Sequence, residues 1–211
     1  VQGGTIDLGA ANLSITGNIV NDGGTINTGS GTVTLNGSAA QSITGSGDGT
    51  NFNNLIINNT NNITTNIAIK VKSSLTMTQG NIVNSELLTI GESSANPGIL
   101  NHSSGVVTGE LRRYFANVVG SKFFPIGTAS NLRDVSVNFL SSPGTDQYLT
   151  ASYVEGAPTL SGGGSYEGLP LIAADGQLIT NYDNEGHWVI NPTGDAYDSD
   201  INLKAYTISL H

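Results

Sequence analysis

Short alternations of aliphatic and polar residues run through the first half of the chain. The segments LSI, TVTL, NLIIN, IAIKV, SLTMT and LLTIG place aliphatic residues mainly at alternate positions, and each is bounded by Gly, Asn or Ser. Successive side chains of a strand point to opposite faces, so this two-residue period predicts β-strands. No window in this half keeps the spacing of an amphipathic helix. We therefore predict an all-β fold.

A twenty-residue repeat predicts how these strands are arranged. Residues 3–17 (GGTIDLGAANLSITG) align with residues 23–37 (GGTINTGSGTVTLNG), and Ile6, Leu13 and Ile15 align with Ile26, Val33 and Leu35. Such self-similarity is typical of repeat architectures, in which stacked coils place equivalent residues about 4.8 Å apart. We predict a right-handed parallel β-solenoid, with Val33 and Leu35 inward and Thr32 and Thr34 outward. The predicted neighbours in adjacent coils are Ile6 with Ile26 and Ile15 with Leu35.

The repeat becomes less regular after Gln41. The tetrapeptide Asn-Ile-Val-Asn still occurs twice, at residues 18–21 and 81–84. We interpret the irregular part as coils with insertions, in which Asn and Thr form hydrogen-bonded ladders at the corners. A β-sandwich is the alternative for this half, because short alternating strands also occur in that fold.

The composition changes near residue 110. Phe52 is the single aromatic residue in 1–109, whereas residues 110–211 contain twelve. The segments VSVNF, YLTASY and YTISL each carry large apolar residues on one face, which favours half-buried antiparallel strands. We predict a solenoid over 1–109 and an antiparallel β-sandwich over 110–211, truncated at its C-terminal end. The boundary falls near GVVTGELRRYF, where the sandwich would cover the open end of the solenoid.

Charge and composition restrict the partners. The net charge is −9 and the sequence pI is about 4.4, so no basic stripe exists to bind nucleic acid. Cys is absent, which excludes disulfides and thiolate metal sites and fits an exported protein. No apolar run reaches the roughly 20 residues of a membrane span. Neither end reads as a natural terminus, so we expect a piece of a longer chain.

The acidic segment GDAYDSD is the candidate metal site. Calcium prefers six to eight oxygen ligands, and extracellular modules often bind it through acidic loops. The segment lacks the EF-hand pattern, and a solvated acidic turn is the favoured explanation for it. Asp183 and Glu185 lie upstream. The candidate calcium ligands are Asp195, Asp198 and Asp200; no other cofactor is expected.

Catalytic groups are few and scattered. Lys70 and Lys72 share one face of a strand, which is typical of a solvated surface, and Arg112 and Arg113 fit a seam between the two halves. The three histidines have no neighbouring Ser and Asp in a recognisable order. We therefore expect no enzyme activity. The aromatic residues that could stack a sugar or fill a core are Tyr148, Tyr153, Tyr166, Tyr182, Trp188 and Tyr197.

The order of several motifs resembles a known group of proteins. GTVTLNGSAAQSITG, FNNLIINN, LTMTQGNIV, GVVTGELRRYF and FPIGT follow one another between Gly31 and Ile190. Together they resemble the repetitive regions of very large secreted surface proteins of Bacteroidota, including adhesin-like cargo of the type IX secretion system. The resemblance implies export, attachment to the cell surface or release, and an adhesive or structural role. The C-terminal domain that directs secretion in that group is not recognisable here.

These observations lead to one expected function and two alternatives. We expect a non-catalytic structural and adhesive segment of a long exported protein, extracellular or at the cell surface, acting as a rigid spacer. Its partners would be other segments of the same chain and surface glycans or proteins, without nucleic acid or a membrane span. The first alternative is an extracellular β-helix that binds or cleaves carbohydrate. The second is binding of ice or crystal surfaces through outward Thr residues.

Overall fold

The structure of the protein is a computed structural model. It describes residues 1–46, 49–140, 142, 144, 146–156, 171–172, 178–179, 185–192 and 206–211. All regular elements in these ranges are strands. Since the described residues form no helix, none of them forms one that could cross a membrane.

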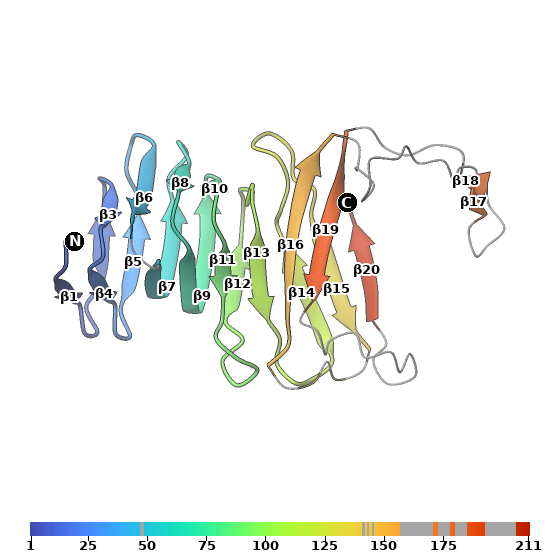
Figure 1. Cartoon of the computed structure of the whole chain (residues 1–211), viewed down its shortest axis with the longest axis horizontal. Helices are drawn as coiled ribbons and strands as arrows, with labels where there is room; N and C mark the ends of the chain where they lie inside the picture. Colours follow the sequence, from blue (N-terminus) through green and yellow to red (C-terminus); the bar gives the residue numbers. More distant parts are fainter. Residues whose placement is uncertain are drawn as a thin grey trace.

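The first part of the chain winds into stacked coils (Figure 1). Strands at the same position of successive coils pair in parallel, and the described coils make a β-solenoid of about five turns. The predicted solenoid is therefore confirmed, and the β-sandwich alternative for this half is wrong. The strands are β1 (Thr5–Asp7), β2 (Leu13–Ile15), β3 (Ile19–Asn21), β4 (Thr25–Asn27), β5 (Thr32–Leu35), β6 (Gln41–Gly45), β7 (Thr50–Asn58), β8 (Ile63–Thr65), β9 (Ile69–Gln79), β10 (Ile82–Asn84), β11 (Leu88–Ile90) and β12 (Ile99–His102).

The coils contribute to separate faces of the stack. One long sheet runs in the order β2-β5-β7-β9-β11, and β12 also pairs with β9. A second sheet runs β3-β6-β8-β10, and β1 pairs with β4 on a further face. The coil length varies, because Ile63 pairs with Ile82 but Ile19 pairs with Ile43. This variation agrees with the interpretation of the later coils as repeats with insertions.

The twenty-residue repeat determines the register of the first two coils. Ile6 pairs with Ile26 and Ile15 pairs with Leu35, as predicted. Val33 and Leu35 are each 1% exposed, whereas the side chains of Thr32 and Thr34 are half-buried on the outer face. Inward aliphatic residues thus stack on their counterparts, which buries apolar surface along the whole axis.

Buried amides occupy the corners at both ends of the strands of the second sheet. Gln41 Nε2 donates to the Ile15 carbonyl oxygen at 2.9 Å, and Asn59 Nδ2 donates to Gln41 Oε1 at 2.9 Å. Asn21 and Asn84, the last residues of the two Asn-Ile-Val-Asn segments, are both buried at the ends of strands in the second sheet. Each of these four amides donates from its nitrogen to a backbone carbonyl oxygen of another coil, so the corners are tied together along the axis.

At the end of the stack, the strand direction changes within one sheet. Strand β13 (Leu111–Tyr114) pairs in parallel with β11 on one edge and antiparallel with β16 (Tyr148–Glu155) on the other. Strand β19 (Gly186–Pro192) then pairs antiparallel with β16. A separate antiparallel sheet contains β14 (Gly120–Phe124), β15 (Val135–Phe139) and β20 (Tyr206–Leu210). The short strands β17 (Leu171–Ile172) and β18 (Leu178–Ile179) pair with each other.

The antiparallel strands and the coils share one hydrophobic core. Val135, Val137 and Phe139 are buried on one face of β15, as the alternation in VSVNF predicted. The arrangement of the two antiparallel sheets fits the predicted sandwich. The long sheet and the hydrophobic core both include residues before and after the predicted boundary between 109 and 110, and the division into two domains there stays a prediction.

The predicted buried face of YTISL is not observed. Ile208 is 37% exposed and Leu210 is 46% exposed, although they pair with the buried Val137 and Val135. Strand β20 has β15 as its neighbour in this sheet and lies at the edge, where the core face ends. Alternation predicted which residues share a face but not whether another sheet covers it.

Candidate functional site

The candidate calcium ligands Asp195, Asp198 and Asp200, and Asp183 upstream of them, lie outside the described residues. Glu185 is exposed and accepts a hydrogen bond from Arg133 Nη2 at 3.2 Å. The described residues contain no group of three or more His, Cys, Asp or Glu side chains that could hold a metal ion. The calcium site therefore stays a prediction.

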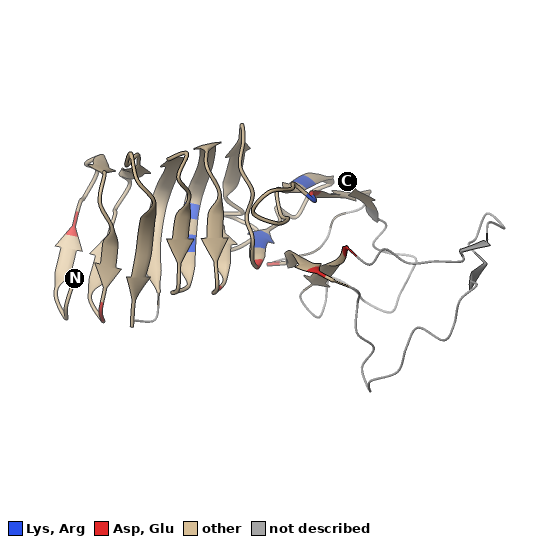
Figure 2. Cartoon of the chain, turned by 90° about the horizontal axis from the view of Figure 1, so that it is seen from above, with Lys and Arg blue, Asp and Glu red and all other residues tan. Residues whose placement is uncertain are grey.

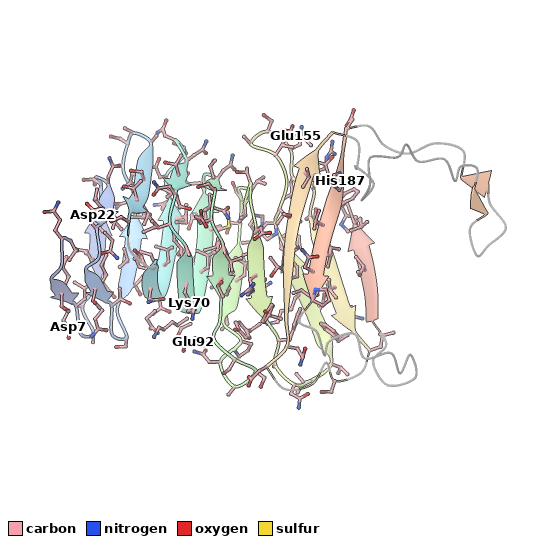
Figure 3. The ribbon with its side chains drawn as sticks, in the orientation of Figure 1. Asp7, Asp22, Lys70, Glu92, Glu155 and His187 are labelled. Atoms are coloured by element: carbon pink, nitrogen blue, oxygen red, sulfur yellow. The ribbon has the colours of Figure 1, made fainter. Side chains whose placement is uncertain are left out.

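The two lysines of β9 lie on the outer face of the solenoid, as predicted. Lys70 is exposed, and Lys72 Nζ lies 3.3 Å from Glu92 Oε1 in an ion pair whose side chains are both more than a third exposed. Glu92 also accepts a hydrogen bond from Asn96 Nδ2 at 3.1 Å. Lys70 and Glu92 are labelled in Figure 3, which draws the side chains of this part of the solenoid. This geometry is that of a solvated ion pair, which contributes little to stability.

The histidines are separated from one another in the fold. His102 Nε2 lies 2.7 Å from the Gly105 carbonyl oxygen and its ring contacts Phe123. His187 Nδ1 lies 3.3 Å from the Gly156 carbonyl oxygen. His211 Nδ1 lies 3.0 Å from Asp134 Oδ2, an exposed pair at the end of β20. None of the hydrogen bonds between described residues joins one of these rings to a serine hydroxyl, the contact that a Ser-His dyad requires.

Positive charge gathers where the coils meet the antiparallel strands (Figure 2). We call Arg112, Arg113, Tyr114, Lys122 and Tyr148 the junction cluster. Alternation along β13 sends the adjacent arginines to opposite faces: Arg113 is buried, and Arg112 lies half-buried on the outer face. One strand therefore supplies both an outer and an inner part of the cluster.

The outer part combines a cation with two aromatic rings. The Arg112 guanidinium carbon lies 4.1 Å from the centre of the Tyr148 ring, and Arg112 Nε donates to Thr150 Oγ1 at 3.1 Å. Tyr114 and Tyr148 are directly opposite in the β13 and β16 pairing, and their rings meet edge to face at 5.3 Å. Half-buried tyrosines next to a hydrogen-bond donor form a surface that can stack on the apolar face of a sugar ring.

The inner part contains a charge without a carboxylate partner. Arg113 is 5% exposed, and its Nη1 donates to the Phe123 carbonyl oxygen at 2.6 Å. Its Nε has no hydrogen-bond partner, and none of the ion pairs between described residues includes it. Burial lowers the pKa of Arg113 to about 10. The guanidinium still carries its charge at neutral pH, so the lowered pKa reflects the free energy that its desolvation costs.

The buried arginine also affects Lys122 on β14. Burial lowers the pKa of Lys122, and the nearby charge of Arg113 lowers it further. Lys122 lies at the rim of an open hollow of about 190 Å³, together with Phe115, Val118 and Val119. The hollow is thus mainly apolar with one cation at its edge.

The aromatic residues predicted for a sugar platform divide between two faces. Tyr148 lies on the outer face in the junction cluster, whereas Tyr153 and Trp188 meet edge to face at 5.4 Å on the core face. Trp188 Nε1 donates to the Arg133 carbonyl oxygen at 2.9 Å, which satisfies the indole of this half-buried residue. Tyr166, Tyr182 and Tyr197 lie outside the described residues.

The sequence indicated a seam at Arg112 and Arg113 but not the burial of Arg113. The signal was present in the alternation from Leu111, which places Arg113 on the inner face with Leu111. Arginine is rarely fully buried, so the residue type gave no indication that this inner position would hold a charge. Comparisons of the chain with family models, curated proteins and solved structures gave no match.

Proposed function

We propose that this chain is a rigid, non-catalytic spacer of a longer exported surface protein, with a structural and adhesive role. The observation that carries the proposal is the long sheet, which continues from β2 through β13 to β19 without interruption. Because β13 belongs to both the coils and the antiparallel strands, a bend at the junction would break backbone hydrogen bonds on one of its edges.

The stacked coils suit a spacer for a physical reason. Each coil adds about 4.8 Å along the axis, since this is the separation of paired strands. Neighbouring coils are held by backbone hydrogen bonds and by aliphatic stacking, so length increases without a new type of contact. The terminal antiparallel strands then offer loops and aromatic residues at one end of the rod.

The location outside the cell is part of the same proposal. A chain without cysteine keeps its fold independent of the redox state of its surroundings. The excess of acidic over basic residues supports a role in solution around the cell, away from nucleic acid. The resemblance to repetitive regions of type IX secretion cargo supports display at the surface or release from it.

A distance measurement between spin labels tests the spacer. The chain has no native cysteine, so T16C in the first coil and E155C at the end of β16 can be labelled selectively; both positions are exposed. We expect a single narrow distance distribution by pulsed double electron resonance. The pair T16C and K70C, both within the coils, is the control for label flexibility. A distribution much broader than that of the control would overturn the rigid spacer.

Carbohydrate binding is a second candidate function, supported by the outer part of the junction cluster. Its two tyrosine rings and the Arg112 guanidinium resemble the stacking and donor groups that sugar sites use. Retardation in gels containing neutral or acidic polysaccharides would test it. Binding that is lost in Y114A and R112A but kept in K70A would support it, and identical mobility of all variants would reject it.

A further inference from the structure

The first coil exposes apolar residues that later coils bury. Ile6 is 43% exposed and its counterpart Ile26 in the second coil is half-buried, and Leu13 is 37% exposed. By contrast Val33, the counterpart of Leu13 in the second coil, is 1% exposed. An open hollow of about 250 Å³ enters the coil here, between Ile6, Leu13 and inner residues such as Phe52. The interior of the solenoid therefore opens at this end.

The strands of the first coil also have free edges. Among the described strands, β1 pairs with β4 alone and β2 with β5 alone. Strand β3 pairs with β6, and Val1 covers part of its other edge through backbone hydrogen bonds with Val20 and Asp22. Figure 1 shows these strands at the far end of the stack, next to the N-terminus. Backbone groups on such an edge, beside exposed aliphatic side chains, are a template for pairing with another strand. Each later coil stacks on an edge of this kind. At the first coil, no described strand pairs with the outer edges of β1 and β2.

Two glycines indicate the type of partner. A Cβ on Gly24 would lie 2.3 Å from Val1 Cγ1 and 2.9 Å from the Gly4 carbonyl oxygen, and a Cβ on Gly37 would lie 2.6 Å from the Thr16 carbonyl oxygen. These glycines are needed because the preceding coil approaches so closely. Their counterparts Gly4 and Gly17 have no atom near enough to meet such a Cβ and do not adopt the left-handed backbone that favours glycine.

We propose that this end binds a further β-coil of the same polypeptide, paired in parallel with β1, β2 and β3. The coil would carry aliphatic residues at its inner positions and would bring its carbonyl groups close to Gly4 and Gly17. This inference rests on the proposed spacer function, because it places the next unit of the rod. Ala11 is the counterpart of Gly31, whose Cβ would lie 2.1 Å from the Ala11 carbonyl oxygen, so the added coil must lie farther away at that corner.

A second copy of the chain fits this end less well than a coil. Two copies related by a two-fold axis would present the same edge to each other. The close approaches at Gly24 and Gly37 arise because residues of the first coil pair in parallel with residues twenty positions later in the sequence. In a two-fold dimer the first coil would instead face the first coil of the other copy, so this pairing of a residue with its counterpart one coil later would not occur. The geometry at Gly4 and Gly17 therefore favours the coil.

Duplicating the first coil tests this inference. A second copy of residues 1–20 is fused in front of Val1. Each residue of this copy then precedes its counterpart in the first coil by twenty positions, which is the natural offset between the first two coils. We expect the amides of β2 to gain protection from hydrogen exchange, and the urea midpoint of unfolding to rise. The control carries a scrambled twenty-residue extension of the same composition. Equal exchange of β2 in both extended chains would overturn the proposal.

Glycine variants make the test specific for close stacking. G4A and G17A should leave the urea midpoint of the 211-residue chain unchanged, because nothing approaches these positions. In the chain with the duplicated coil, each should lower the midpoint by about 0.5–1 M. The same effect in both chains would contradict the inference, as would a dimer of the 211-residue chain with protected β2 amides by light scattering and exchange. The label distances across the junction do not depend on these outcomes, so the spacer and the added coil can fail separately.

Discussion

The coils and the antiparallel strands bury their cores with different side chains. The coils stack aliphatic residues on identical or similar neighbours, such as Ile6 on Ile26, with Phe52 as their single aromatic residue. The antiparallel strands instead fill their interior with large rings, and Phe115 meets Phe139 edge to face at 4.6 Å. They also bury the charged Arg113 at the junction.

The difference shows how strand connection determines the core. In a solenoid every coil has nearly the same cross-section, so aliphatic residues of medium size fill each layer. The free energy of folding is then approximately a sum of the contributions of single coils and of the contacts between neighbouring coils. At β13 the long sheet continues while a new sheet begins at β14, and the distance between them must be filled by longer side chains. Arg113 reaches across it, from β13 to the Phe123 carbonyl oxygen of β14.

The largest expected effect is at a ring in the antiparallel core. Phe124 is fully buried, and its replacement in F124A should reduce the free energy of unfolding by about 3–5 kcal/mol, because the cavity cannot be filled by small neighbours. Urea unfolding followed by circular dichroism measures this change. V118A, at a position that is 62% exposed, should change it by less than about 0.5 kcal/mol. Similar losses in both variants would contradict the assigned core.

A truncation inside the coils should have a smaller and more local effect. I57A removes a side chain that is 1% exposed and stacks between Leu35 and Met77. We expect a loss of about 2–4 kcal/mol, with hydrogen exchange increased mainly in β5, β7 and β9. If exchange increased equally in β15 and β16, the coils would not be the locally coupled units described here.

The buried arginine should be replaceable at little cost. R113M removes the desolvation of the guanidinium and leaves the Phe123 carbonyl without its donor, so we expect a change in unfolding free energy of less than about 1 kcal/mol. R113A should be clearly less stable, because it also leaves a cavity. Urea midpoints of the two variants and the native chain make the comparison. A loss in R113M as large as that in R113A would mean that the charge itself stabilises the junction.

The smallest expected effect is a pH dependence from Lys122. Its pKa is lowered in the folded chain by burial and by Arg113, so between that pKa and the ordinary value of about 10.5 the unfolded chain binds more protons. Stability contributed by this group therefore rises with pH across that window. Unfolding midpoints between pH 8 and 11 should show a rise in the native chain that K122M reduces. An unchanged profile in K122M would assign the dependence to another group.

Repetition made the coils predictable from local pattern. The alternation around Val33 and Leu35 predicted which side chains point inward, and the twenty-residue period predicted the pairing of Ile15 with Leu35. Both follow from the sequence because each coil packs on a copy of itself, so position in the repeat determines the neighbour. The composition change near residue 110 likewise indicated where a different packing begins.

The arrangement after β13 was decided by tertiary structure. Alternation gave the faces of β15 and β16, but not that β16 would pair antiparallel with β13, nor that Ile208 would stay exposed. The candidate site depends on the same contacts, since Tyr114 meets Tyr148 and Arg113 meets Phe123 only after distant strands pair. Without a repeat, the neighbour of a strand depends on which sheet edge is still free when the chain returns. That is a property of the whole fold, which no local pattern encodes.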